Sequence, residues 1–204
     1  THNVILTAMD SAGNSATSTT VLTVTDSEIP IVASKGNYTV SLNSAGSASV
    51  TVGDVSLGSS DACGVTLAVS PSTFTCSDVG TVDVTLTATD TNSNTNTATT
   101  SVTVADSTNP TVAAVTSFTA TLDSSGAANI AISDILTSSA DVCGIAGHTL
   151  SQSAFSCSDV GTHSITLTAS DNNGNTAADT ASVVIQDTSA PSLSTKSATV
   201  SLNS

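Results

Sequence analysis

Positive charge is almost absent from this sequence. Lys35 and Lys196 are its only lysine or arginine residues, against 16 Asp and Glu residues, and the formal net charge is −14 at pH 7. A nucleic-acid-binding surface needs basic side chains to neutralise phosphate, and an anionic membrane surface repels a chain of this charge. The composition therefore excludes nucleic acid as a partner and disfavours contact with a membrane surface.

Large aromatic side chains and long apolar runs are scarce as well. The sequence has no tryptophan, one tyrosine and three phenylalanines, so it lacks the aromatic clusters on which sugars and protein partners usually dock. No apolar stretch approaches the roughly 20 residues of a transmembrane helix, so we expect no membrane insertion in this segment. No GxSxG elbow or comparable setting for a nucleophile occurs either, and an enzyme is not indicated.

Internal repetition is what the chain has in abundance. TVTDSEIP at residues 23–30 recurs as TVADSTNP at 103–110 and as VIQDTSAP at 184–191, which places the equivalent aspartates 80 and 81 residues apart. A second element runs in step with the first and reads LTAMDSAGN, LTATDTNSN and LTASDNNGN. Self-similarity at this period is typical of a tandem array of modules, which usually serves as a spacer, a stalk or a multivalent surface.

The period divides the chain into two complete repeats and two partial ones. Residues 1–26 match the C-terminal part of a repeat, 27–106 and 107–187 are complete, and 188–204 match the N-terminal part of the next repeat. We therefore expect the sequence to be a window from a longer array, out of phase with its modules.

Strand patterns dominate within each repeat. In TVDVTLTATD, Val82, Val84, Leu86 and Ala88 alternate with polar residues, as expected of a strand with one buried face. Similar alternation and turns rich in Gly, Asn, Asp and Ser predict about seven strands per repeat, the number in an immunoglobulin-like sandwich. The predicted fold class is all-β, with immunoglobulin-like modules of about 80 residues arranged end to end.

The four cysteines fall as one pair per repeat, Cys63 with Cys76 and Cys143 with Cys157. An even count at a repeated spacing favours disulfides and an oxidising, extracellular setting. A zinc site requires the two pairs to converge, whereas they belong to separate repeats. We therefore predict one disulfide within each repeat, as a staple for a small core that is poor in aromatic residues.

Acidic residues recur at the predicted strand ends. In a sandwich of this type, the last turn of one module and the linker that enters it lie at the same end, so these acids converge where successive modules meet. Calcium takes six to eight oxygen ligands and accepts such a mixture of carboxylate and amide oxygens. The predicted calcium ligands are Asp26, Glu28, Asp54, Asp61, Asp90 and Asn92 at the first junction, Asp106, Asp134, Asp141, Asp171 and Asn173 at the second, and Asp187 in the last linker.

An ordinary turn explains the same residues without a metal. Aspartate begins turns by accepting a hydrogen bond from its own backbone two residues on, and DSAGN or DNNGN reads as such a turn between two strands. The motifs also lack the spacing of an EF-hand loop. Both interpretations, calcium and turn chemistry, stay open at this point.

The elements SSDACGV, FTCSDVGTVDVTLTATD and TVADSTNP together resemble the hyalin-repeat (HYR-like) modules of Bacteroidetes cell-surface adhesins, including those of gliding motility. The resemblance spans both complete repeats and both partial ones. It implies an immunoglobulin-like fold, export by the type IX secretion system and display at the cell surface. By position, the four cysteines match the family's cysteine pair. The motifs that begin at Asp10, Asp106 and Asp179 resemble the O-glycosylation signal of that phylum, with Ser11, Ser107 and Thr180 as acceptors.

These observations favour a structural protein. The leading hypothesis is a stalk or filament segment of an extracellular adhesin, stiffened by calcium and partnered by neighbouring repeats of its own chain. Lateral or end-to-end self-association into filaments is expected, because partial repeats leave open sheet edges. The main alternative is an adhesive module that binds glycans or other cell-surface ligands directly. An ice-binding face of outward threonines is a third hypothesis, disfavoured because the module period does not suit a flat solenoid.

Overall fold

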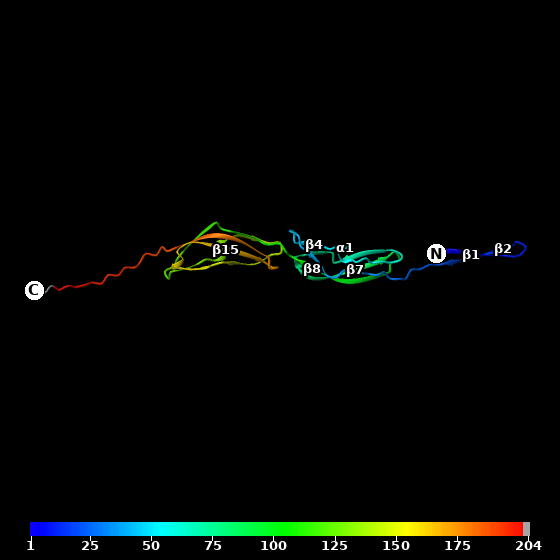
Figure 1. Ribbon diagram of the computed structural model, residues 1–204, viewed down its shortest axis with the longest axis horizontal. Helices are drawn as coiled ribbons and strands as arrows, with labels where there is room; N and C mark the ends of the chain where they lie inside the picture. Colours follow the sequence, from blue (N-terminus) through cyan, green and yellow to red (C-terminus); the bar gives the residue numbers. More distant parts are fainter. Residues whose placement is uncertain (202–204) are drawn as a thin grey trace. The chain divides into compact units, whose positions relative to one another are not determined.

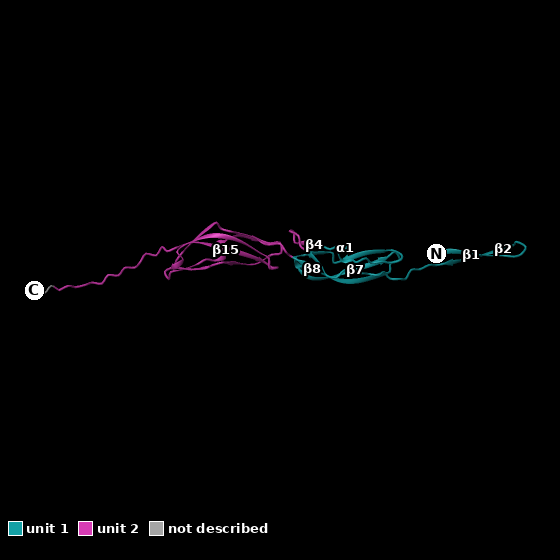
Figure 2. Cartoon of the chain, in the orientation of Figure 1, with its two compact units in different colours: residues 1–40, 48–105 teal, residues 41–47, 106–204 magenta. Residues whose placement is uncertain are grey.

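The computed structural model describes residues 1–201, so the last three residues of the predicted C-terminal partial repeat lie outside the described residues. It separates into two compact units, residues 1–40 with 48–105 and residues 41–47 with 106–204 (Figure 2). The main boundary between the units falls between residues 105 and 106, and the division of the chain into complete and partial repeats stays a prediction.

Strands make up most of both complete repeats (Figure 1). The first contains β3 (Tyr38–Ser41), β4 (Ser47–Ser49), α1 (Val52–Val55), β5 (Val65–Ser70), β6 (Thr73–Thr75), a 3-10 turn (Cys76–Asp78), β7 (Gly80–Asp90) and β8 (Thr95–Ala105). The second contains β9 (Thr111–Ala114), β10 (Ser117–Thr121), β11 (Ala127–Asn129), α2 (Ile132–Ile135), β12 (Leu136–Ala140), β13 (Ile145–Leu150), β14 (Ala154–Ser156), a 3-10 turn (Cys157–Asp159), β15 (Gly161–Asp171) and β16 (Thr176–Gln186). Neither α1 nor α2, each a four-residue turn, has the length or hydropathy of a membrane span.

The main sheets of both repeats have the same strand order. A four-stranded sheet runs β3-β8-β7-β5 in the first repeat and β10-β16-β15-β13 in the second, opposite a smaller pairing of β4 with β6 or β11 with β14. The second repeat also pairs β12 with β9, where the first has two isolated bridges. β10 runs parallel to β16, and the other pairs in that sheet are antiparallel. This arrangement confirms the predicted fold class, an all-β protein built of immunoglobulin-like sandwich modules.

The predicted alternation fills the core between the two layers. Val84, Leu86 and Ala88 of β7 are fully buried, whereas the threonines between them lie on the other face. In the second repeat, Ile165, Leu167 and residues from β16 form the equivalent core, closed on the opposite side by Phe155 of β14. Because the period-two pattern places one face inward, the sequence sets which residues are buried.

An isolated hairpin precedes the first complete repeat. β1 (His2–Met9) pairs antiparallel with β2 (Ser15–Leu22), and every residue of both strands is exposed. Within the described residues, these two strands form a sheet of their own. The hairpin is equivalent in sequence to β7 and β8, but within the described residues no second sheet covers it.

The two cysteines of the first repeat lie at opposite ends of it. Val65, two residues after Cys63, pairs with Asp90 at one end of β7, whereas Cys76 begins the turn that leads into Gly80 at the other end. β7 has 11 residues, so its ends are about 33 Å apart at roughly 3.3 Å per residue. A disulfide needs Cα atoms within about 7 Å of one another, which no pairing within this repeat provides.

The second repeat separates its cysteines in the same way. Ile145, two residues after Cys143, pairs with Asp171, whereas Cys157 lies at the opposite end, where its Sγ is 3.6 Å from the carbonyl oxygen of Gly126. Cys76 and Cys143 are disulfide-bonded, and Cys63 and Cys157 are free and exposed. The predicted pairs Cys63–Cys76 and Cys143–Cys157 are therefore wrong, because the strands between each pair span the length of the repeat.

Candidate functional site

Each repeat has two ends with different structures. The entry end holds the turn between the last two long strands (β7 and β8, or β15 and β16), and the incoming linker lies against that turn. The exit end is the opposite one, where the chain leaves the last strand. Most of the predicted metal ligands lie at the entry end, in distinct groups.

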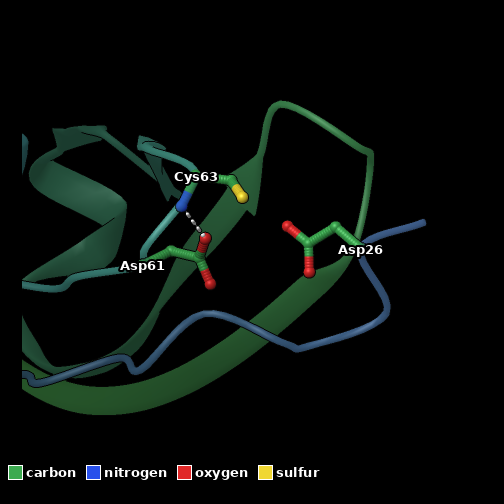
Figure 3. Close-up of side chains that lie close together, drawn as sticks. All are labelled: Asp26, Asp61 and Cys63. Carbon is green, nitrogen blue, oxygen red and sulfur yellow. Dashed lines mark hydrogen bonds between the residues drawn. The ribbon is translucent and has the colours of Figure 1, made fainter. Parts of the chain in front are cut away.

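The first acidic group lies at the entry end of the first repeat. The ligand atoms of Asp26, Asp61 and Cys63 all lie within 4.8 Å of one another, with both carboxylates half-buried and the thiol exposed. The Asp26 carboxylate points from the linker toward the other two side chains (Figure 3). Figure 3 also shows the hydrogen bond, 2.7 Å long, that the Cys63 amide donates to Asp61 Oδ1.

Hydrogen bonds hold the linker carboxylate in this position. Asp26 Oδ1 accepts the amide of Glu28 at 3.1 Å, and Asp26 Oδ2 accepts the side-chain amide of Asn92 at 2.9 Å. The side-chain amide of Asn94 reaches the Asp26 carbonyl oxygen at 3.4 Å. The linker is therefore fixed to the turn of the repeat that follows it.

The second repeat builds the same group from equivalent residues. Asp106, Asp141 and Cys143 have ligand atoms within 4.8 Å of one another, all half-buried. Asn173 donates its side-chain amide to Asp106 Oδ2 at 2.8 Å, and the Cys143 amide donates to Asp141 Oδ1 at 2.7 Å. Because the contacts recur as well as the residues, the carboxylate pair is a regular structural feature of both repeats.

The buried aspartates beside these groups have a different task. Asp171, only 2% exposed, accepts the backbone amides of Asn173 and Asn175 through Oδ1, both at 2.8 Å. Its Oδ2 accepts the side-chain amide of Asn175 at 2.7 Å. Asp90 makes the same set of bonds in the first repeat. These aspartates organise the turn, which is the chemistry that the ordinary-turn interpretation predicts.

The hydrogen bonds of Asp171 also govern its charge. Burial raises the pKa of Asp171, but the bonds from Asn175, Asn173 and Gly174 outweigh this effect and leave the pKa below its ordinary value of 3.8. The carboxylate is therefore ionised at neutral pH and neutralised by N–H dipoles. A turn of this kind needs no cation.

Four other predicted ligands lie outside the two groups. Asp54 accepts the amide and hydroxyl of Thr51 at the start of α1, and Asp134 accepts the amide of Ala131 at the start of α2. These two carboxylates cap single-turn helices, as acidic residues do at the third helical position. Glu28 is exposed, and Asp187 accepts the amide of Ser189 in the last linker.

The thiol in the first group is a poor metal ligand. A hydrogen bond to Asp26, together with the negative charges of Asp26, Asp61 and Asp90, raises the pKa of Cys63 to about 11. The same hydrogen bond is the largest cause that lowers the pKa of Asp26, followed by the bonds from Glu28 and Asn92. The protonated thiol therefore donates to an ionised carboxylate, and Cys143 is in a disulfide. The ligands that both repeats can offer to a metal ion are therefore the two carboxylates of each group.

The chemistry of this donor set fits a hard cation. The oxygens of the two carboxylates in each group lie within 4.8 Å of one another. Like charges at this distance repel each other, and a divalent ion placed between them converts that repulsion into attraction. A carboxylate has about four acceptor positions, so the hydrogen bonds to these aspartates leave lone pairs on both. Calcium accepts such oxygens with flexible geometry and completes its shell with water.

Sequence reasoning missed the asparagine that completes each turn. Asn14, Asn94 and Asn175 each donate a side-chain amide to the aspartate four residues before them. Asn94 and Asn175 also reach the linker carbonyl. The sequence carries a signal for this role, because all three turns end in asparagine. The three proposed glycosylation acceptors, Ser11, Ser107 and Thr180, are exposed, and their modification stays a prediction.

Comparisons with known proteins return distant structural likenesses. No family model and no curated protein matches the sequence, so the resemblance to hyalin repeats stays a prediction. Among solved structures, PcdhgB3 EC1-4 is 14% identical with a TM-score of 0.36, and the match covers 92% of this chain and 57% of that one. Human mucin-like protocadherin EC1-2 is 12% identical with a TM-score of 0.38, over 78% of this chain and 98% of that one.

The fibronectin(III)-like modules of CbhA from Clostridium thermocellum are 14% identical with a TM-score of 0.29, over 91% of this chain and 86% of that one. The chain thus spans little more than half of the first of these structures and most of the other two. The assignment of the sandwich fold rests on the strand pairing of the chain itself.

Proposed function

We propose that this chain is a structural segment of an extracellular adhesin or filament, in which a calcium ion binds the carboxylate pair at the entry end of each repeat. The observation that supports it is the recurrence of one arrangement: Asp26 with Asp61, and Asp106 with Asp141, held by equivalent hydrogen bonds. The disulfide adds support for an oxidising compartment outside the cell. Export by the type IX system and a role in gliding belong to the same proposal, through the resemblance alone.

The position of the two carboxylates explains what the ion does. Asp26 belongs to the linker, whereas Asp61 belongs to a loop of the folded repeat. An ion that binds both ties the linker to the repeat and limits the directions in which the linker leaves it. Repeated along an array, this restraint turns flexible connections into stiff ones. Without the ion, the same charges favour separation of linker and loop.

The test measures the free energy of unfolding of the first repeat in the presence of calcium and in the presence of a chelator. Tyr38 is the only tyrosine, so its fluorescence reports on unfolding of the first repeat. Calcium at 100 times its dissociation constant raises the free energy of unfolding by about 2.7 kcal/mol by mass action. Asp61→Asn is expected to abolish this increase. Asp83→Asn, which removes an equal charge from an exposed position on β7, is expected to keep it.

Stiffening has its own measurement. Hydrogen exchange of residues 23–30 is expected to slow when calcium is added, because the ion restrains the linker, and the radius of gyration is expected to increase. Equal stability with calcium and with chelator, or equal loss in Asp61→Asn and Asp83→Asn, would contradict the metal site. If calcium raises stability but does not slow hydrogen exchange in the linker, the ion stabilises the repeat locally and the stiffening role is wrong.

A further inference from the structure

Each main sheet ends in an edge strand on the side away from β3 or β10. That strand is β5 (Val65–Ser70) in the first repeat and β13 (Ile145–Leu150) in the second, both six residues long. One side of β5 pairs with β7, and one side of β13 pairs with β15. Within the described residues, no further strand pairs with the other side of either one. An unpaired side presents a row of backbone N–H and C=O groups that another strand can join.

The edge strand of the second repeat is irregular. The register of β13 against β15 shifts between Ile145 and Gly147. Such an irregularity bends the strand and increases its twist, which is one of the ways in which proteins prevent pairing at a sheet edge. His148 Nε2 also lies 2.8 Å from Ser139 Oγ of β12, so this side chain ties the edge strand to another strand of its own repeat. β13 is therefore a poor template for an added strand.

The edge strand of the first repeat lacks this protection. All six residues of β5, from Val65 to Ser70, pair with β7 in an unbroken register. Its sequence, VTLAVS, contains neither a charged residue nor a proline, and these are the residues that usually prevent pairing at an edge. Its outward side chains are exposed, and the apolar side chains between them are half-buried. β5 is therefore a regular, uncharged edge about 20 Å long, at roughly 3.3 Å per residue.

We propose that β5 is the surface through which two copies of this chain associate, each copy adding its edge strand antiparallel to that of the other. Two four-stranded sheets then become one sheet of eight strands. Antiparallel pairing of identical strands has two-fold symmetry, so both copies use the same surface. A register centred on Leu67 or on Ala68 places inward residues opposite inward residues, which keeps the apolar face of the joined sheet continuous. This association goes beyond the proposed calcium-stiffened stalk and does not depend on the metal.

The charge distribution favours this partner and this orientation. Asp26 and Asp61 lie at the entry end of the repeat, where β5 begins with Val65. In an antiparallel pair centred on Leu67, Val65 of one copy lies opposite Val69 of the other, so the two entry ends are about 14 Å apart along the strands. Salt screens exposed charges over roughly 8 Å, so the acidic groups of the two copies barely repel each other. A parallel pair places these groups side by side, where they repel strongly.

Analytical ultracentrifugation over a series of concentrations tests the association. The wild-type chain is expected to approach twice its monomer mass of 19.9 kDa as its concentration rises, with chelator as well as with calcium. Ala68→Lys puts a charge in the middle of the exposed side of β5. This variant is expected to raise the dissociation constant of the dimer by about tenfold or more, because the two lysines then lie close together across the joined edge.

The matched control makes the same change on the other edge strand. Thr149 of β13 pairs with Thr168 as Ala68 of β5 pairs with Thr87, and Thr149 is also exposed. Thr149→Lys changes the net charge by the same amount and is expected to keep the wild-type dissociation constant. Hydrogen exchange locates the contact: residues 65–70 are expected to exchange more slowly as the concentration rises, whereas residues 145–150 are expected not to change.

Four results would overturn the proposal. They are a wild-type chain that stays monomeric at about 1 mM, equal weakening in the two lysine variants, slower exchange at residues 145–150 alone, and a dimer that non-reducing electrophoresis shows to be linked by a disulfide. The association is measured with chelator, whereas the proposed calcium site is tested by the effect of calcium on unfolding. Failure of the β5 contact and failure of the proposed function are therefore distinguishable.

Discussion

The isolated hairpin β1–β2 and the β7–β8 hairpin of the first repeat have related sequences but opposite surroundings. Leu6 is 73% exposed, whereas its equivalent Leu86 is fully buried. Their turns are nevertheless built alike, since Asp10 accepts the amides of Ala12 and Asn14 as Asp90 accepts those of Asn92 and Asn94. The turn is therefore encoded locally, while burial depends on the sheet that covers the hairpin.

The largest expected effect comes from removing the same leucine in both surroundings. Leu86→Ala leaves a cavity in a closed core and is expected to lower the free energy of unfolding by about 3 kcal/mol. Leu6→Ala removes an exposed side chain and is expected to change it by less than about 0.5 kcal/mol. Urea denaturation followed by Tyr38 fluorescence measures both. Equal losses would mean that the hairpin is covered in solution by a surface that the described residues do not supply.

The turn aspartate gives the second comparison. Asp171→Ala leaves two backbone amides without their acceptor at a site that is 2% exposed, and is expected to cost about 2 kcal/mol. Asp10→Ala has the same effect on bonding, but its amides are exposed to water, so no measurable change is expected. Hydrogen exchange at residues 171–175 and 10–14 distinguishes the two. Faster exchange at both turns alike would contradict a role for burial.

The pH dependence of stability tests the role of the buried Asp171 carboxylate in a third way. The folded pKa of Asp171 lies below its ordinary value of 3.8, so the ionised side chain contributes stability above pH 3.8 that is lost as the pH falls through the folded pKa. Stability of the second repeat is therefore expected to decrease below pH 3.8. Asp171→Ala is expected to lose less than the wild type between pH 5 and pH 2. Thermal unfolding at a series of pH values checks this, and parallel curves would rule out Asp171 as a titrating contributor.

Local patterns were predictable, and distant relations were not. The alternation of Val82, Val84, Leu86 and Ala88 predicted a strand with one buried face, and the structure has it as β7. The single helical turn α1 was not predicted. Thr51 and Asp54 carry the signal for it, because an acidic residue three positions after a threonine favours a helix start.

The cysteine pairing failed for a physical reason. One pair of cysteines in each repeat suggested Cys63 with Cys76, but the strands between them are extended and carry the second cysteine to the far end of the repeat. The predicted metal ligands also fall into two classes. Aspartates such as Asp90, which accepts hydrogen bonds from the backbone amides of its own turn, organise that turn. Those brought together from linker and loop, such as Asp26 and Asp61, became the candidate site. Neither the positions of the cysteines nor the meeting of the linker and loop carboxylates can be predicted without the register of the sheet.

The smallest expected effect concerns one backbone position shared by the three turns. Gly13, Ser93 and Gly174 all have positive φ values, at 88°, 72° and 91°. Only glycine adopts this region without a steric cost, and another residue pays about 1 kcal/mol there. Ser93→Gly is therefore expected to stabilise the first repeat by about 0.5 kcal/mol, because the gain in the turn is partly offset by the greater freedom of glycine in the unfolded chain. Gly174→Ser is expected to destabilise the second repeat by a similar amount, while Gly13→Ser changes only the exposed hairpin. Urea unfolding of the three variants orders these effects, and a loss of stability in Ser93→Gly would show that the serine side chain makes a contact worth more than the strain it carries.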